Sequence, residues 1–551
     1  MQEAPYFTFK AYMKNIYNTA LHTIPIDLDL GCPNRTKDGI GGCTFCPENG
    51  ARAAQLLDAK DVEEQIKNAI SFSKNRYNAN EFMLYIQAYT GTFTSVINQK
   101  QIYSKLLNLY KFKAISIGTR PDCLNTKTLE YLQELNEQID VYIDLGIQTL
   151  NDSTLKSINR GHDSKCSIEA IKKIKKYNLK VFAHIIVGFE NETREDWLNT
   201  VQNIVKQKVD GIKIHNLHII KNTQLYKQFK TRAFKVYNEY EYADELIFLI
   251  RNIPKEIPII RTSTDTSSTH LIAPIWHMQK GQFVEYINET MNYQGYSQGD
   301  LLDKQTLKLK KQNSFTLEDN SVTIWDKTYK DFYHPKSGAY TQANELFIKK
   351  SKLEEKLQKN DLNILDIGFG MGYNSLAIIK LPKEKKVNIT ALDKNRVIIK
   401  HSSNLNSNSD EKKILDSIFE TLKYEDANNS LQLLLGDARF TITKLEKKYD
   451  IVFLDAFLPN LNPSLLTYDF FILLKAVLNK DAIIICSQNN SIIKAGFAKA
   501  GFIYEDFNIN RTDIKALIIK QGSNTSQDRY YEDPFLIYRE KQIVTNFEKN
   551  I

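Results

Sequence analysis

The sequence predicts an α/β chain in two parts: a partial barrel of about six parallel strands over residues 1–302, then an open, doubly wound sheet over residues 303–551. Short apolar runs alternate with helix-like stretches in both parts. The alternation stops in LLDKQTLKLKKQNSFTLEDNS, a polar and basic segment with the composition of a linker or a small module. A length of 551 residues also fits more than one domain, because single domains hold roughly 100 to 200 residues.

Six β-branched runs form the framework of the first part. They are TIPIDLDLG, FMLYIQAYT, AISIGTR, VYIDLGIQT, VFAHIIVG and IKIHNLHII, which begin at residues 23, 82, 114, 141, 181 and 212. Between them, stretches such as DVEEQIKNAISFSKN space their apolar residues three and four apart, as an amphipathic helix does. A repeated strand–helix–strand order produces parallel strands with right-handed crossovers. We therefore predict a partial TIM barrel whose functional side chains lie where the strands end.

Polar residues follow or close each of these runs. They are Cys32 after the first, Gln87, Tyr89 and Thr90 at the second, Thr119 and Arg120 at the third, Gln148 at the fourth, His184 at the fifth, and His215 and His218 at the sixth. Arg120 has a planar donor fork that can bind a carboxylate at two points, which a lysine cannot do as rigidly. The plain alternative, that such residues only satisfy backbone groups at strand ends, stays open for each of them.

The composition favours a soluble protein of a reducing compartment. Apolar residues make up 42% and charged residues 25%, and no apolar stretch approaches the ~20 residues that cross a bilayer. The start, MQEAPYFTFKAYMKN, lacks the basic end and apolar run of a secretory signal, and cysteines are sparse. We expect a cytoplasmic protein with no membrane partner. The net charge of +8 suits a polyanion such as a nucleic acid, but is too modest to identify one.

Three of the six cysteines lie within GCPNRTKDGIGGCTFC, as Cys32, Cys43 and Cys46. Structural zinc takes four ligands, usually as two pairs, and only Cys43 and Cys46 form a pair. A disulfide needs an even number of cysteines in an oxidising compartment, and a redox CxxC motif leaves Cys32 without a role. A [4Fe-4S] cluster on three thiolates leaves one iron open for another ligand. The cluster is the favoured interpretation, with zinc and chance spacing as the alternatives.

Seven ordered segments resemble the YhcC-type radical S-adenosylmethionine (radical SAM) family, also called the YtqA type, along nearly all of the first part. The segments are GCPNRTKDGIGGCTFC, YIQAYTGTF, SIGTRPDCL, DLGIQTLNDSTLKSINRGHD, AHIIVGFENETREDW, KIHNLHIIKNT and LIAPIW. The resemblance implies a [4Fe-4S] cluster on the three cysteines, whose open iron binds the amino and carboxylate groups of S-adenosylmethionine. It also implies that Gln87, Tyr89 and Thr90 lie near the methionine amino group, and that Gln148 and His184 face the adenosyl group or the substrate.

The second part repeats the strand–helix pattern, with a glycine turn after its first strand. Its seven strands are predicted in NILDIGFGMGYNSLAIIK, VNITALDKN, LQLLLGDARF, YDIVFLDAFLPN, AIIICSQ, FIYEDFN and KALIIK, the order expected of a Rossmann-like class I methyltransferase sheet. The turn holds Gly368, Gly370 and Gly372. A dinucleotide-binding dehydrogenase also places glycines there, but the third glycine of its GxGxxG fingerprint is replaced here by Tyr373.

Four aspartates close the first four of these strands, and the first three favour S-adenosylmethionine over NAD. They are Asp366, Asp393, Asp437 and Asp455. Asp366 suits the methionine amino group, Asp393 can bind both ribose hydroxyls, and Asp437 lies where methyltransferases bind adenine. A dehydrogenase and a unit that has lost its cofactor remain the alternatives.

DFYHPKSGAYTQANELFI, LDIGFGMGYNSL, LLGDARFTI and FLDAFLPNLNPSLLTYDFF together resemble the methyltransferase part of MnmC, over about residues 315–520. MnmC methylates the amine of 5-aminomethyl-2-thiouridine at the wobble position of tRNA, after an FAD-dependent oxidase domain has removed a carboxymethyl group from that amine. This chain carries a radical unit instead of the oxidase. The resemblance therefore implies that radical chemistry performs the preceding step. Asp455 would orient the amine or accept its proton, unless it only caps the following turn.

We therefore expect a bifunctional tRNA wobble-uridine modification enzyme with two S-adenosylmethionine sites. Its first part would convert 5-carboxymethylaminomethyl-(2-thio)uridine to the 5-aminomethyl nucleoside, and its second part would methylate that amine to give 5-methylaminomethyl-(2-thio)uridine. The expected partners are tRNA and an electron donor such as flavodoxin or ferredoxin. Two alternatives stay open: a radical unit that acts on another tRNA position or substrate, and a tRNA-binding or iron-sensing protein whose cluster is structural.

Overall fold

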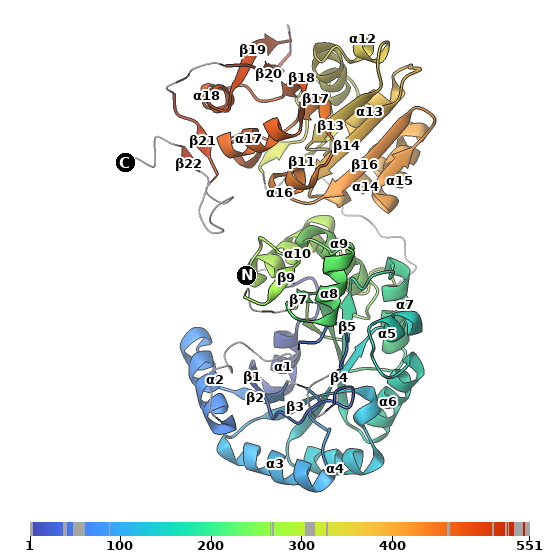
Figure 1. Cartoon of the computed structure of the whole chain (residues 1–551), viewed down its shortest axis with the longest axis vertical. Helices are drawn as coiled ribbons and strands as arrows, with labels where there is room; N and C mark the ends of the chain where they lie inside the picture. The colour runs from blue at the N-terminus through green and yellow to red at the C-terminus, as the bar shows by residue number, and fades with distance from the viewer. Residues whose placement is uncertain are drawn as a thin grey trace. The chain divides into compact units, whose positions relative to one another are not determined.

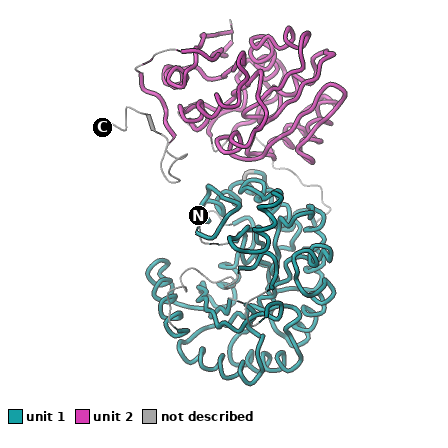
Figure 2. Tube along the Cα trace, viewed as in Figure 1, with its two compact units in different colours: residues 1–307 teal, residues 308–551 magenta. Residues whose placement is uncertain are grey.

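The computed structural model describes residues 4–36, 41–47, 61–87, 89–264, 266, 269–302, 314–326, 329–459, 463–509, 512–523, 526, 528–533 and 544–545. The chain forms two compact units, residues 1–307 and 308–551 (Figure 2). Each unit has its own sheet and its own hydrophobic core. Among the described residues, no helix has the length and apolar content needed to cross a membrane.

The first unit contains a curled sheet of seven parallel strands in the order β1-β2-β3-β4-β5-β6-β8. The strands are β1 (His22–Ile26), β2 (Phe82–Ile86), β3 (Ala114–Thr119), β4 (Asp140–Gln148), β5 (Lys180–Val187), β6 (Gly211–Asn216) and β8 (Ile259–Arg261). Each of the six predicted runs overlaps one strand of this sheet, which confirms the partial barrel. The pattern does not predict β8, because three residues carry too little periodicity. This seventh strand pairs with β6 and places Arg261 beside Lys213.

Helices cover the outer side of the curled sheet (Figure 1). Strand side chains alternate between two faces, so in β4 Ile143 and Leu145 face the helices while Tyr142 and Asp144 face the inner side. Helix α1 packs Met13 against Tyr142 on the inner side. The helices are α1 (Phe9–Tyr17), α2 (Val62–Tyr77), α3 (Val96–Leu109), α4 (Thr126–Asn136), α5 (Asp152–Ser157), α6 (Ser164–Lys176), α7 (Arg194–Val205), α8 (Gln224–Thr231), α9 (Glu239–Arg251) and α10 (Lys280–Gln294), and the strands β7 (Ile219–Ile220) and β9 (Leu271–Ala273) pair separately.

The second unit contains an eight-stranded sheet in the order β15-β16-β14-β13-β17-β18-β20-β19. Its strands are β13 (Leu362–Ile367), β14 (Val387–Asp393), β15 (Lys423–Glu425), β16 (Asn429–Leu435), β17 (Tyr449–Leu454), β18 (Leu478–Cys486), β19 (Phe502–Asn508) and β20 (Lys515–Gln521). All seven predicted strands are present, and the short edge strand β15 is additional. Strands β14 and β17, which flank β13, both follow it in the chain. This arrangement creates a switch point at the carboxyl end of β13, where open α/β sheets bind ligands.

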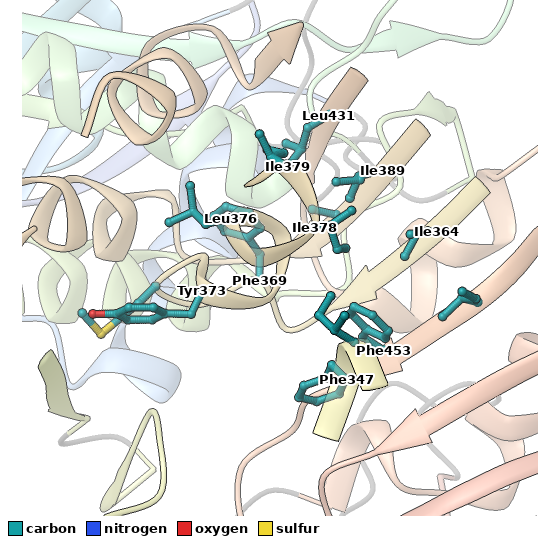
Figure 3. Close-up of a cluster of buried hydrophobic side chains, with 14 of the residues drawn as sticks. Phe347, Ile364, Phe369, Tyr373, Leu376, Ile378, Ile379, Ile389, Leu431 and Phe453 are labelled. Atoms are coloured by element: carbon teal, nitrogen blue, oxygen red, sulfur yellow. The ribbon is translucent and has the colours of Figure 1, made fainter. Parts of the chain in front are cut away.

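One hydrophobic core of the second unit lies between this sheet and helix α13 (Tyr373–Lys380), which begins directly after the glycine turn. Ile364, Ile389 and Leu431 on three adjacent strands point toward the helix that carries Ile378 (Figure 3). Burial of such side chains contributes about 25 cal/mol per Å² of apolar surface. The packing therefore fixes the end of β13 relative to the start of α13, and with them the turn that joins the two.

The polar segment predicted as a linker or small module falls partly outside the described residues. Its remainder opens a three-stranded antiparallel sheet of β10 (Ser314–Thr316), β11 (Val322–Asp326) and β12 (Asp331–Phe332). A π-helix follows at Gln342–Ile348, a form that is often found at functional sites. The other elements of this unit are α11 (Ala339–Thr341), α12 (Leu353–Leu357), α13 (Tyr373–Lys380), α14 (Arg396–Leu405), α15 (Ser409–Thr421), α16 (Ala438–Thr441), α17 (Tyr468–Ala476), α18 (Ser491–Lys499), β21 (Tyr531–Glu532) and β22 (Val544–Thr545).

Gly368 provides a test of the glycine turn. Its φ of +86° lies in the left-handed region, and a Cβ atom at this position would lie 2.1 Å from the backbone oxygen of Asp455. We expect Gly368→Ala to lower the free energy of unfolding of the second unit by about 2–5 kcal/mol, through backbone strain and overpacking. Calorimetric unfolding of the full chain measures this change.

Gly281→Ala is the matched control, since a Cβ at Gly281 in α10 would have no atom within 4 Å. This exchange should leave stability unchanged or raise it by up to about 1 kcal/mol, because alanine favours a helix more than glycine does. Equal unfolding transitions for the wild type and Gly368→Ala would contradict the close approach of the turn to Asp455.

Candidate functional site

The loop that carries the three cysteines follows β1 and is held by backbone hydrogen bonds to two distant segments. Thr90 N–H, just after β2, donates to Gly31 O at 3.2 Å. Thr44 N–H donates to Ile158 O at 2.9 Å, at the end of α5. The described parts of the loop are therefore anchored at the carboxyl end of the sheet, as the strand-end rule predicts.

The three sulfurs of this loop lie near one another. Cys43 is buried, and Cys32 and Cys46 are half-buried. Burial raises the pKa of the Cys46 thiol, and the neighbouring thiols of Cys43 and Cys32 add to the shift. Within the described residues, no three His, Cys, Asp or Glu side chains converge closely enough to hold one metal ion. A cubane cluster does not need such convergence, because each thiolate binds a different iron, so the donor set fits a [4Fe-4S] cluster with three protein ligands.

Three side-chain nitrogens surround the Cys43 sulfur. Arg160 Nη1 lies 3.4 Å away, and Arg120 Nη1 and Asn34 Nδ2 each lie 3.8 Å away. Arg160 belongs to the turn INRGHD, residues 158–163, which follows α5. Gly161 in that turn has a φ of +81°, and a Cβ there would meet Asn34 Oδ1 at 2.7 Å, so the turn approaches the cysteine loop closely. Cations and N–H donors favour the thiolate form that iron ligation requires.

Arg120 binds a carboxylate at two points, but the carboxylate belongs to the chain itself. Its Nε and Nη2 atoms donate to the two oxygens of Asp122, each at 2.9 Å. Nη2 also donates to Arg160 O at 2.6 Å. Burial acts to raise the pKa of Asp122, but the hydrogen bonds and charge of Arg120 lower it overall. The guanidinium fork is thus occupied by Asp122, and Arg120 supports the cysteine loop.

Residues at the ends of β2 and β4 adopt unusual backbone conformations. Gln87, Tyr89 and Thr90 follow β2, and Tyr89 has a positive φ of 56°. Thr90 is 1% exposed, and its Oγ1 has no hydrogen-bond partner among the described residues. Gln148 ends β4 with a φ of 74°. Such conformations cluster at functional sites, so they agree with the expected roles of these residues without testing them.

A buried group of charged and polar side chains occupies the inner face of the first unit. Asp144 is 1% exposed, and its Oδ2 forms an ion pair with Lys213 Nζ. Its Oδ1 lies 2.7 Å from His184 Nε2. His215 stacks on His184 with 5.4 Å between ring centroids, and Lys213 Nζ lies 4.5 Å from the ring centroid of Tyr85. We call these five residues the inner polar group.

Only the two histidines of the inner polar group are predicted from the sequence. Asp144 and Lys213 stand inside apolar runs, where the pattern assigns them to a strand and nothing more. A charged residue within a buried parallel strand is nevertheless a signal, because a buried charge requires a partner. His218, the other predicted histidine, lies between β6 and β7 and contacts Thr266 Oγ1 through Nδ1 at 2.8 Å.

The electrostatics of the inner polar group follow from its burial. Burial acts to raise the pKa of Asp144, but the neighbouring His184 and Lys213 lower it overall, so Asp144 is ionised. Burial lowers the pKa of both His184 and His215, and nearby positive charge adds to this effect. Both imidazoles are therefore neutral near pH 7.

In the second unit, three aspartates gather at the carboxyl ends of β13, β14 and β17. Asp366 is 0% exposed and accepts a hydrogen bond from Ser375 Oγ at 2.6 Å, while its Oδ1 has no partner among the described residues. Burial raises the pKa of Asp366 to about 7, and the charges of Asp455 and Asp393 add to the shift. Burial likewise raises the pKa of Asp455 to about 6. Neighbouring carboxylates with raised pKa values fit a cationic ligand such as S-adenosylmethionine, because a positive charge favours their ionised form.

The glycine turn lies against these carboxylates. Gly370 N–H donates to Asp393 Oδ2 at 2.7 Å, and Asn395 N–H donates to Asp393 Oδ1 at 2.8 Å. Both oxygens retain a second lone pair, as an acceptor for ribose hydroxyls requires. Gly368, Gly370 and Gly372 all have positive φ values, of 86°, 53° and 88°. The predicted turn is therefore present, and only glycine adopts such a succession without strain.

The side chain of Asp455 is held by two amides. Asn374 Nδ2 donates to its Oδ2 at 2.9 Å, and Gln342 Nε2 donates to its Oδ1 at 3.3 Å. In the described part of the chain, the carboxylate accepts no hydrogen bond from the backbone of the following turn, so turn capping does not explain this residue. Neither amide is predicted from the sequence, because Gln342 opens the π-helix and Asn374 lies in α13, and both are far from Asp455 along the chain.

Asp437, which is expected near the adenine, is paired within the chain. Arg439 Nη2 donates to its Oδ2 at 2.7 Å, and Arg439 Nε donates to its Oδ1 at 3.0 Å. Arg439 also pairs with Asp533 at 2.7 Å. Burial acts to raise the pKa of Asp437, but Arg439 lowers it overall. The carboxylate of Asp437 is thus part of an ion-pair network in which Arg439 binds both Asp437 and Asp533.

Three half-buried aromatic side chains adjoin the glycine turn and Asp455. Tyr329 stacks on Phe457 with 4.4 Å between ring centroids, and Tyr333 meets Phe457 edge-on at 5.0 Å. A Cβ added to Gly370 would lie 3.1 Å from Tyr333, and Phe457 follows Asp455 by two residues. We call Tyr329, Tyr333 and Phe457 the aromatic group; such rings are suited to stacking on a nucleobase.

Both units match known families. Residues 30–204 match the family model of the Radical SAM superfamily, and residues 209–293 match that of the Radical_SAM C-terminal domain. Residues 407–535 match the model described as S-adenosyl-L-methionine-dependent methyltransferase. The uncharacterized protein YtqA of Bacillus subtilis is 30% identical over 305 residues, which cover 55% of this chain and 94% of YtqA.

The second unit has relatives among tRNA-modifying proteins. The tRNA 5-methylaminomethyl-2-thiouridine biosynthesis bifunctional protein MnmC of Burkholderia vietnamiensis is 27% identical over 202 residues, which cover 33% of this chain and 31% of MnmC. The crystal structure of MNMC2 from Aquifex aeolicus is 25% identical, with 45% of this chain and 78% of that chain covered and a TM-score of 0.34. The chain therefore belongs to the radical SAM superfamily, as an enzyme that joins a YtqA-like radical SAM unit to an S-adenosylmethionine-dependent methyltransferase unit.

Proposed function

We propose that this enzyme performs two consecutive steps on the wobble uridine of tRNA in the cytoplasm. The radical unit, residues 1–302, converts 5-carboxymethylaminomethyl-(2-thio)uridine to 5-aminomethyl-(2-thio)uridine. The methyltransferase unit, residues 303–551, then methylates the new amine. The observation that carries this proposal is the union, on one chain, of a YtqA-like radical unit with a methyltransferase unit similar to a part of MnmC. In MnmC, an oxidase domain removes the carboxymethyl group before methylation. In this chain, the radical unit takes the place of that oxidase.

The chemistry of the substrate favours a radical step. The carbon to be attacked lies between a nitrogen that donates electrons and a carboxylate that withdraws them, so loss of its hydrogen atom gives a stabilised radical. This radical then loses one electron to an oxidised flavodoxin or ferredoxin and also loses a proton, which gives an imine. Water hydrolyses the imine to the amine and a two-carbon oxo acid. Direct cleavage of the carbon–nitrogen bond is a second route to the same amine.

The residues of the radical unit divide between cofactor and substrate. Cys32, Cys43 and Cys46 hold the [4Fe-4S] cluster, and Gln87, Tyr89 and Thr90 adjoin the methionine end of S-adenosylmethionine. Together, the reduced cluster and this cofactor supply the radical that removes the substrate hydrogen. Gln148 and His184 face the substrate, and Arg160 and Arg120 hold the Cys43 side of the cysteine loop in place.

The residues of the methyltransferase unit position a cationic cofactor and a nucleophilic amine. Asp366 and Asp393, with the glycine turn, bind the second S-adenosylmethionine. Asp455, fixed by Gln342 and Asn374, orients the amine of the modified uridine and accepts its proton. The aromatic group stacks on the uracil ring. In-line attack on the methyl group then requires mainly that the two reactants are held in place.

Nucleosides from mutant strains test the order of the two steps. In cells whose only copy carries Cys43→Ala, we expect the 5-carboxymethylaminomethyl nucleoside to accumulate, because the amine is never formed. In Asp366→Ala cells we expect the 5-aminomethyl nucleoside instead, with little of the methylated product. Mass spectrometry of digested tRNA separates these species, and purified Cys43→Ala should lack the roughly four irons of the reconstituted wild type.

Cys166→Ala serves as the control, since Cys166 lies in the first turn of α6, outside the cysteine loop, and should support normal modification. Unchanged wobble nucleosides in Cys43→Ala cells would disprove the first step but not the methylation. A change at a different tRNA position would favour another substrate for the radical unit. Normal nucleosides in both mutant strains, with the cluster intact in the wild type, would favour a sensor.

The methylation step should depend on the ionisation of Asp455. Burial raises its pKa to about 6, so the fraction that is ionised falls about tenfold between pH 8 and pH 5. At saturating cofactor, kcat/KM for 5-aminomethyl tRNA should fall correspondingly as the pH is lowered through about 6. Asp455→Asn should lose this inflection and about 100-fold in rate, because a general base contributes roughly that much. Asp506→Asn, on the exposed strand β19, should keep the wild-type profile. An inflection that persists in Asp455→Asn would exclude this residue as its source.

A further inference from the structure

Two cations, Lys213 and Arg261, lie with the carboxylate of Asp144 on the inner face of the first unit. Lys213 on β6 and Arg261 on β8 are register neighbours in the sheet. Lys213 is committed to Asp144, the anion of the inner polar group. Among the described residues, no side chain or backbone oxygen supplies a hydrogen-bond acceptor or counter-ion to Arg261. Arg261 is half-buried, and a guanidinium at the end of a strand without a counter-ion from the chain is suited to bind an anion from outside it.

The charge of Arg261 acts on the rest of the inner polar group. Burial is the main cause that lowers the pKa of His215, and His184, Arg261 and Lys213 lower it further. The same guanidinium contributes to the lowered pKa of His184 and of Lys213. With both imidazoles neutral, the two cations and the one carboxylate leave a net charge of +1. The group is thus complementary to a single negative charge.

The hydrogen bonds of Thr264 determine which nitrogen of His215 can accept a hydrogen bond. Thr264 Oγ1 donates its only proton to Asn216 O at 2.6 Å. The same oxygen lies 3.5 Å from His215 Nδ1, so in this contact the nitrogen must carry the hydrogen. In the neutral imidazole, Nε2 is then the acceptor. This atom is buried, and no described residue donates to it.

We propose that Arg261 and His215 form a subsite for an N-substituted glycine group, in which Arg261 binds the carboxylate and His215 Nε2 accepts the amine N–H. The subsite rests on the proposed function, whose substrate carries this group, –NH–CH2–COO⁻, on the wobble uridine. Two contacts on either side of one carbon fix that carbon in place, and it is the carbon from which the hydrogen is removed. The product retains the amine but not the carboxylate, so it loses the contact with Arg261 and is released.

Binding and turnover of two matched RNAs test the subsite. One is an anticodon stem-loop that carries 5-carboxymethylaminomethyluridine, and the other carries the corresponding neutral amide. The full chain, reconstituted anaerobically, should bind the acid about 10- to 100-fold more tightly than the amide, because charge-assisted bonds to a carboxylate are lost in the amide. Arg261→Gln should abolish this preference by weakening the acid alone, and Arg261→Lys should restore part of it. His215→Phe should weaken the acid and the amide alike, since both retain the amine.

Controls separate a subsite from a structural role. Iron content and reductive cleavage of S-adenosylmethionine without RNA should be unchanged in Arg261→Gln, and Arg232→Gln, which removes an exposed ion pair with Glu190, should keep the acid preference. If the wild type converts the acid but Arg261→Gln keeps the preference, the subsite is wrong and the proposed function stands. If the wild type converts neither RNA but its acid preference depends on Arg261, the subsite stands and the proposed reaction is wrong. If no acid preference exists in the wild type, the subsite is overturned.

Discussion

Parallel strands all end at the same edge of a sheet, and this constraint organises both units of the enzyme. In the first unit it brings the cysteine loop, the residues after β2, Arg120 and Gln148 to one edge, although they are spread over more than a hundred positions of the chain. In the second unit it gathers three aspartates around the glycine turn. Side-chain alternation adds a second consequence, because it directs Asp144, His184 and Lys213 to the same inner face.

The two sites have opposite electrostatic character, which matches what each is proposed to bind. Around Cys43 the chain supplies arginines and an amide, which stabilise thiolates. Around the glycine turn it supplies carboxylates that are costly to keep ionised without a cation. The inner polar group lies between these extremes, since its single carboxylate is already paired with Lys213. Each site is therefore incomplete in charge, and the missing charge indicates the class of its ligand.

The sequence predicts the strands, the cysteine loop and the glycine turn well because each is a local pattern. Strands β8 and β15 escape prediction because three residues do not establish a period. Arg160 escapes because its contact with Cys43 depends on the path of the chain between two residues that are 117 positions apart. Gln342 and Asn374 reach Asp455 from two different elements, so no single motif contains the site.

Two residues with the chemistry of ligands prove to be occupied within the chain. Arg120 is taken by Asp122 and Asp437 by Arg439, and in both cases the partner stands two positions away. A charged residue with an opposite charge so close in sequence is therefore weak support for a ligand contact. Arg261 shows the reverse situation, because it lies on an unpredicted strand and its neighbours in sequence, Ile260 and Thr262, are uncharged.

The raised pKa values of Asp366 and Asp455 have a consequence for how the second site exchanges its ligands. Near neutral pH these buried carboxyls retain part of their protons. A cofactor that brings a sulfonium and an ammonium group favours the ionised carboxylates, so its entry expels protons and its departure takes them back. Hydrogen ions and a cationic cofactor thus compete for these carboxylates, and acidification acts on this unit as an inhibitor that needs no binding pocket of its own.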